Sequence, residues 1–182
     1  INGVITVTTQ TAGYSNDGTL KRLVATPLSR RDWILANMIQ QSVLALVMTA
    51  VMVLFARLLF GVTVLPGPIA LALIVVGAVA FSGLGIALGS FAGDPDAATS
   101  IGNAIAFPLM FLSGVFWQLD IVPPFLRTVA RMLPLYHFHR GLRQLMIVQT
   151  MQGVFVPFAV LGIGAVISLS LAVAATSWQD FG

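Results

Sequence analysis

The sequence predicts an all-α integral membrane protein, folded as a bundle of transmembrane helices. Of its 182 residues, 58% are hydrophobic and only 8% are charged, and the mean hydropathy is +0.97. A soluble domain carries roughly 25% charged and about 45–50% apolar residues, so this chain cannot hide its apolar side chains inside a globule. The charged residues also stand between long apolar blocks, which is typical of helices that cross a bilayer.

Charge and composition exclude several classes of function. Nine Lys and Arg residues against six Asp and Glu residues give a formal net charge of +3, but the basic residues are scattered along the chain. We therefore expect no nucleic-acid partner. The absence of cysteine excludes disulfides, thiolate metal sites and a cysteine nucleophile. The chain begins at Ile1 without a basic region or signal peptide, and we expect an amino-terminal part of the protein to be missing.

Four uncharged runs each have room for one transmembrane helix, which needs about 20 mostly apolar residues. The predicted transmembrane helices are residues 33–60, 69–91, 97–116 and 154–177. Arg57 falls near the end of the first helix, where its long side chain can reach the membrane interface, and we prefer this to a role in transport. Residues 1–12 are too short to span and are predicted to end a preceding helix.

Local signals mark where these helices begin. Ser29 and Asp32 fit a capping box in front of the first predicted span. Asp94 stands directly before Pro95, which places a capping residue in front of a proline at the first helical position. Pro108 lies inside the third predicted span and should kink it.

A short amphipathic helix is predicted over residues 17–28. Leu20, Leu23 and Val24 share one helical face, Lys21 and Arg22 lie on the other, and Pro27 ends the helix after about two turns. A helix of this length is unstable alone in water, so its apolar stripe should dock on another protein. The alternative is a helix lying on the membrane surface.

Residues 117–152 are predicted to form a broken helical hairpin that does not cross the membrane. Pro123 and Pro124 open its first short helix and Pro134 closes it, and a second short amphipathic stretch follows. In the first helix Arg127 and Arg131 lie opposite an apolar stripe. That stripe consists of Phe125, Leu126, Val129, Met132 and Leu133.

Three sets of residues could form sites inside or beside the spans. Gly85 and Gly89 form a Gly-x-x-x-Gly pattern, which supports close helix packing, either within one subunit or at a subunit interface. An adaptable apolar surface for a hydrophobic substrate could be lined by Met38, Met48, Met52 and Met110. Ordinary packed or lipid-facing methionines explain these residues as well. His137 and His139 point apart on a helix, so we expect no metal there.

Several motifs together resemble the bacterial type-2 ABC transporter permeases. The first is Gly18-Thr19-Leu20-Lys21-Arg22-Leu23 followed by Ala25-Thr26-Pro27-Leu28-Ser29. The others are Phe111-Leu112-Ser113-Gly114-Val115-Phe116-Trp117-Gln118-Leu119-Asp120, Pro123-Pro124-Phe125-Leu126-Arg127 and Leu133-Pro134-Leu135. The resemblance implies six helices, of which this chain holds the end of the second and all of the third to sixth.

The resemblance also implies sites and an orientation, which the positive-inside rule leaves open because four basic residues flank each side. Residues 17–28 would be a cytoplasmic coupling helix that docks on the ATP-binding subunit, and residues 117–152 an external re-entrant hairpin. The implied coupling residues are Asp17, Gly18, Thr19, Leu20, Lys21, Arg22 and Leu23. The implied hairpin residues are Trp117, Asp120, Pro123, Pro124, Arg127 and Arg131.

The implied function is that of a permease subunit in an ATP-driven exporter of the bacterial plasma membrane. The chain has no Gly-rich phosphate loop, so ATP and Mg²⁺ would bind two partner ATPase subunits, and the chain itself would bind no cofactor or metal. A second permease subunit, identical or homologous, would complete the path. Because the spans are nearly free of charge, we expect a hydrophobic drug or lipid-like substrate. Polysaccharide or glycolipid export and an ion-coupled secondary transporter are the alternatives.

Overall fold

A computed structural model describes residues 2–16, 30–92, 94–115 and 123–175, and these residues form helices and their connections with no strand among them. The helices are α1 (Asn2–Asn16), α3 (Arg30–Phe60), α4 (Pro68–Phe91), α5 (Pro95–Leu112), α6 (Pro124–Met132), α7 (Pro134–Arg143) and α8 (Phe155–Ala175). A single π-helical turn, η2 (Gln144–Val148), continues α7. The described residues therefore agree with the all-α prediction.

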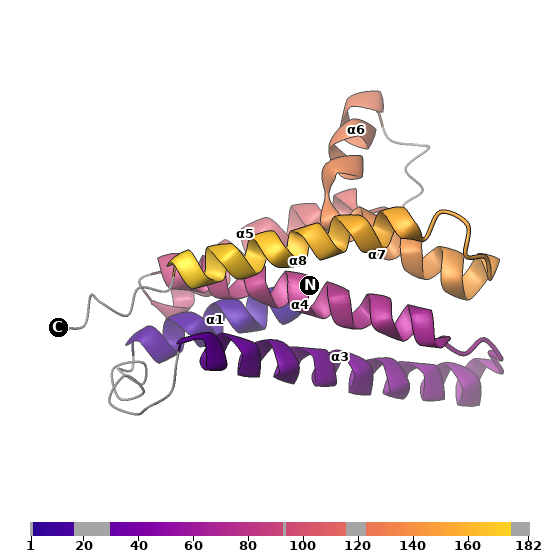
Figure 1. Ribbon diagram of the computed structural model, residues 1–182, viewed down its shortest axis with the longest axis horizontal. Coiled ribbons are helices and arrows are strands. Elements are labelled where there is room, and N and C mark those ends of the chain that lie inside the picture. Colours follow the sequence, from indigo (N-terminus) through magenta and orange to yellow (C-terminus); the bar gives the residue numbers. More distant parts are fainter. Residues whose placement is uncertain (1, 17–29, 93, 116–122, 176–182) are drawn as a thin grey trace.

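The central helix of the bundle is α4, which packs against α1, α3 and α8. Figure 1 shows α3, α4 and α8 running side by side along the long axis of the molecule. α5 lies against α1 at one end of the bundle, and α7 lies against α8 and α4 toward the other end. Between them α6 stands out crosswise to α8.

Three helices are long and apolar enough to cross a membrane, judged on the described residues: Asp32–Phe60, Pro68–Phe91 and Phe155–Ala175. At about 1.5 Å per residue, the 21 residues of α8 match the roughly 30 Å hydrocarbon core of a bilayer. The fourth predicted span, residues 97–116, corresponds to α5, which has 18 described helical residues. Asn103 and Pro108 lower its hydropathy, so the count of four spans remains a prediction.

The ends of the helices follow from local chemistry. The Asp94 carboxylate accepts a hydrogen bond of 2.7 Å from the backbone N–H of Ala97, which confirms the cap predicted for α5. α3 stops before Gly61, whose backbone φ of +63° is a left-handed conformation that glycine adopts without strain. α4 begins with Pro68 in its first turn, where the missing N–H costs no hydrogen bond.

The core also contains α1, although its sequence is rich in threonine. Thr8 and Thr11 are 0% and 2% exposed, like the neighbouring Val7 at 0%. The Thr8 hydroxyl donates to the carbonyl oxygen of Val4 at 2.7 Å, so its polar group is satisfied within the helix and its methyl group can pack. Between helices, the hydroxyl oxygens of Thr9 and Thr99 lie 2.9 Å apart and join α1 to α5.

Candidate functional site

A cavity of about 500 Å³ lies where α1, α3, α4, α5 and α7 meet. Most of its wall is small or apolar, and the large apolar side chains are Leu44, Met48, Ile74, Phe81, Met110, Leu135 and Phe138. None of the described residues that line it is charged. Pockets of about 300–1,000 Å³ with mainly apolar walls are typical of small-molecule sites. The cavity therefore suits an uncharged apolar molecule.

Two polar side chains, Gln41 and Ser82, contribute to the wall of this cavity. Ser82 donates its hydroxyl hydrogen to the carbonyl oxygen of Val79 at 3.1 Å, within α4. Gln41 is 8% exposed, and its Oε1 lies 3.8 Å from the place that a Cβ on Gly3 would take. A glutamine amide offers two donors and one acceptor oxygen. Gln41 is thus the richest hydrogen-bonding group in the described wall.

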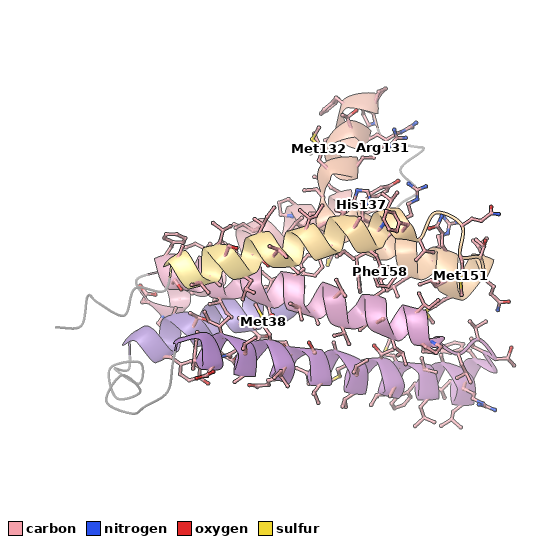
Figure 2. The ribbon with its side chains drawn as sticks, viewed as in Figure 1. Met38, Arg131, Met132, His137, Met151 and Phe158 are labelled. Carbon is pink, nitrogen blue, oxygen red and sulfur yellow. The ribbon has the colours of Figure 1, made fainter. Side chains whose placement is uncertain are left out.

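The four methionines singled out in the sequence have different surroundings. Met48 and Met110 line the cavity from α3 and α5. Met38 is 3% exposed and packs with Ile34 in the core, and Figure 2 shows it between α3 and the rest of the bundle. Met52 is 70% exposed on the outer face of α3. Only two of the four therefore belong to the candidate site.

The two glycines of the Gly-x-x-x-Gly pattern lie where α4 touches α1. A Cβ on Gly85 would come within 2.9 Å of the carbonyl oxygen of Val4. A Cβ on Gly89 would come within 2.5 Å of the carbonyl oxygen of Thr8. Real Cβ atoms do not approach oxygens so closely, so the glycines allow the two backbones to meet. Of the two alternatives, contact within one chain and contact between subunits, the structure contains the first.

The segment α6–α7 carries several arginines. It lies toward the end of the bundle that is opposite to the start of α3. Arg131 is exposed on α6, and Arg140 and Arg143 are exposed on α7, while Arg127 is half-buried. The ring Nε2 of His137 donates to the carbonyl oxygen of Arg131 at 2.8 Å, which fixes the elbow at Pro134 between the two helices. Pro123 and Pro124 are exposed at the start of α6.

The side chain of His139 adds little positive charge to this segment. Burial lowers the pKa of His139 below its ordinary value, and the neighbouring positive charge of Arg143 lowers it further. His139 is therefore mainly neutral at pH 7.

Several predicted site residues lie outside the described residues. These are the coupling residues Asp17, Gly18, Thr19, Leu20, Lys21, Arg22 and Leu23, and the hairpin residues Trp117 and Asp120. Their roles remain predictions from the sequence. The cavity, in contrast, was not predicted, because its wall combines residues from five separate helices. The signals in the sequence were Gln41, a polar residue inside a long uncharged run, and two of the four methionines, Met48 and Met110.

Comparison with known protein families gives one match. The model of the ABC-2 type transporter family matches residues 1–147, which is well over half of the chain. The matched residues include α1 to α7 and therefore every helix that lines the cavity. No curated protein matches the chain.

Proposed function

Because the chain belongs to the ABC-2 type transporter family, we propose that it is the membrane-spanning permease subunit of an ATP-driven exporter for hydrophobic drugs or lipid-like molecules. The family's membrane domain is the permease part of an ABC transporter and not its ATPase. Its partner is an ABC ATP-binding subunit. Two such subunits would bind ATP and Mg²⁺ below a pair of permeases in the bacterial plasma membrane.

The observation that carries the substrate class is the cavity described above. Its described wall is uncharged and its main polar group is the amide of Gln41. An apolar molecule gains by burying its surface there, whereas a polysaccharide has many hydroxyl groups that would lose their hydrogen bonds to water. A hydrophobic substrate therefore fits this permease better than a large polar one.

The energy would reach the membrane through residues 17–28, which lie outside the described residues. Closure of the ATP-bound subunits would push this segment, and the spans would then change between two access states. Leu20→Asp tests this step, because an unpartnered carboxylate buried in a protein groove costs several kcal/mol. We expect the permease to insert normally and the ATPase subunit to be lost on purification or to hydrolyse ATP without transport. Wild-type recruitment and transport would favour the surface-helix alternative.

Two substitutions on α3 test the cavity as a substrate site. Ala45 lines the cavity, whereas Ala50 on the same helix is exposed. Ala45→Trp should fill much of the space and lower the apparent affinity for an apolar dye such as Nile red at least tenfold. Ala50→Trp adds the same bulk outside the cavity and serves as the matched control. The measurements are dye-stimulated ATPase activity of the assembled complex and ATP-dependent dye uptake into inside-out vesicles.

The outcome separates the candidate functions. Equal dye affinities in the two variants would remove the cavity from the transport path. ATPase stimulation by a lipid-linked glycan and not by apolar dyes would favour polysaccharide or glycolipid export. Uptake into right-side-out instead of inside-out vesicles would reverse the direction of transport.

A further inference from the structure

The short helix α6 is attached to the bundle by a small part of its surface. Ala130 is fully buried on the side of α6 that meets the protein. Among the described elements, α5 and α7 make the main contacts with α6. Figure 1 shows that its axis runs crosswise to α8 and away from the bundle. Since α4 and α8 run along the membrane normal if they span, α6 lies roughly in the plane of the membrane.

The helix has two different faces. Phe125, Val129 and Met132 are 67%, 45% and 76% exposed and form an apolar stripe at helical spacing. Arg131 lies on the other side, one turn after Arg127. Nothing among the described residues covers the stripe, and in water three large apolar side chains on about two turns of helix would be unfavourable.

The faces point in the directions that a bilayer requires. In Figure 2, Met132 lies on the side of α6 toward the carboxyl end of α8, which is toward the middle of the bundle. Arg131 lies on the opposite side, toward the end of the bundle where Met151 is found. The hydrogen bond from His137 to the carbonyl oxygen of Arg131 holds this orientation. The apolar stripe thus faces the bilayer interior and the arginine faces its surface.

Among the residues that the structure describes, the charged ones toward this end of the bundle are arginines. Arg57 ends α3, and α6 and α7 together carry four arginines without an acidic residue. The acidic side chains that the structure describes, Asp32, Asp94 and Asp96, stand at the starts of α3 and α5, at the other end. Arg131, Arg140 and Arg143 are exposed here, and exposed arginines on a membrane-facing surface favour anionic phosphate groups.

We propose that α6 is an interfacial helix that docks on anionic phospholipid headgroups of the leaflet bordering this end of the bundle. Its apolar stripe enters the upper acyl region, and Arg131, with Arg140 and Arg143 on α7, binds lipid phosphates. The occupant of this surface is thus the membrane itself. The proposal holds for any transported substrate, so it does not depend on the function proposed above.

The depth of α6 tests the first half of the proposal. This chain contains no cysteine, so single spin labels can be placed at Phe125→Cys, Val129→Cys and Met132→Cys without background from it. Labels at Thr128→Cys and Arg131→Cys serve as controls on the polar side. In the full-length permease assembled with its ATPase in lipid nanodiscs, we expect the first three labels to be accessible to oxygen and the last two to a water-soluble nickel reagent.

Two results would overturn this placement. Nickel access at all five positions would put α6 in water. Low access of both reagents at the stripe would mean that a protein, such as a second permease subunit, covers it.

Headgroup selectivity tests the second half. A fluorophore at Met132→Cys is quenched by nitroxide-labelled phosphatidylglycerol or phosphatidylcholine, and the ratio of the two affinities gives the preference for anionic lipid. Each arginine near a surface contributes roughly a fivefold factor, from about 1 kcal/mol per basic residue. Arg131→Gln combined with Arg140→Gln should therefore lower the preference at least fivefold. Arg57→Gln, the same change on α3, should leave it unaltered, and equal effects of the two changes would refute a headgroup site at α6.

Discussion

The most apolar 18-residue stretches of α3 and α4 have the same mean hydropathy of 2.5, and yet these stretches are buried to very different extents. In the most apolar 18-residue stretch of α4, 56% of the residues are buried in the protein, whereas in α3 none are. Hydropathy alone would place both helices in the membrane and would not separate them. The difference shows that hydropathy decides whether a helix enters the bilayer, and another property decides whether it meets protein or lipid there.

The property that differs is the size of the side chains. α4 carries glycines at positions 77, 83, 85 and 89, and α3 carries none. Each of these glycines accommodates a neighbour: Phe138 at Gly77, Ser168 at Gly83, and α1 at Gly85 and Gly89. Between helices in lipid there is no hydrophobic driving force, so contact area and close approach determine which faces associate. The small residues therefore make α4 the centre of the bundle.

The buried side chains of α3 lie in its first turns. Ile34, Met38 and Gln41 are buried at helical spacing, and later residues such as Leu54 are exposed. The remainder of α3 offers large apolar side chains that suit acyl chains. A substitution on α4 should therefore lower the stability of the protein strongly, and a substitution on most of α3 should change it little. At Gln41 we expect an intermediate effect, measured on ligand binding.

The largest expected effect is that of leucine at the α1–α4 contact. Gly89→Leu places a side chain where even a Cβ would be 2.5 Å from a carbonyl oxygen of α1. Overpacking typically lowers the free energy of unfolding by about 1–3 kcal/mol. We expect a loss of about 3 kcal/mol here, because the new side chain would clash with backbone atoms of α1. Gly85→Leu should behave in the same way. Thermal unfolding of the detergent-solubilised complex measures the loss.

Ala50→Leu on the exposed face of α3 is the matched control for the glycine variants. It adds similar bulk to an exposed position of another apolar helix and should leave the unfolding temperature unchanged. If the two glycine variants are as stable as this control, the α1–α4 contact does not exist in the assembled protein and the comparison between α3 and α4 fails.

A smaller effect is expected from removing side-chain volume. Leu73 on α4 is fully buried, whereas Leu54 on α3 is 56% exposed. Leu-to-Ala changes in protein cores lower the free energy of unfolding by about 2–5 kcal/mol. We expect about 2 kcal/mol for Leu73→Ala, because in the unfolded protein this side chain would be surrounded by lipid, which is also apolar. Leu54→Ala should cost close to nothing, since lipid fills the space. Equal losses in chemical denaturation would mean that α3 is also covered by protein.

Much of the fold could be predicted from the sequence because charge is so unfavourable in lipid. The long uncharged runs are sufficient to indicate an all-helical membrane protein, and the motifs led to the family that the comparison shows. The central place of α1 could not be predicted. From the sequence, residues 1–12 are only the end of a preceding helix. In the structure, the hydroxyl of Thr8 is satisfied by a carbonyl oxygen of its own helix, so the methyl group of this side chain can pack in the core.

The candidate site was less predictable than the fold. A cavity between five helices depends on how they pack, and periodicity within one helix gives no information on this. Of the methionines proposed as a substrate surface, Met38 is buried in the core and Met52 is exposed, so residue type alone did not identify the wall. The crosswise direction of α6 depends on the elbow at Pro134, which the sequence shows only as a break.

An effect smaller than those on α4 is expected at Gln41, a buried polar residue of α3. Gln41 lies in the cavity wall, and its neighbour Gln40 is exposed on the same helix. Fluorenone and fluorene share one ring system and differ by a carbonyl group, which the Gln41 amide can donate to. A neutral hydrogen bond contributes about 1 kcal/mol, so Gln41→Leu should lower the affinity for fluorenone about fivefold. The affinity is measured by competition with a bound apolar dye. Fluorene should be unaffected, and Gln40→Leu should change neither ligand. If Gln41→Leu weakens both ligands equally, its effect is on packing, and the apolar wall alone would then select the substrate.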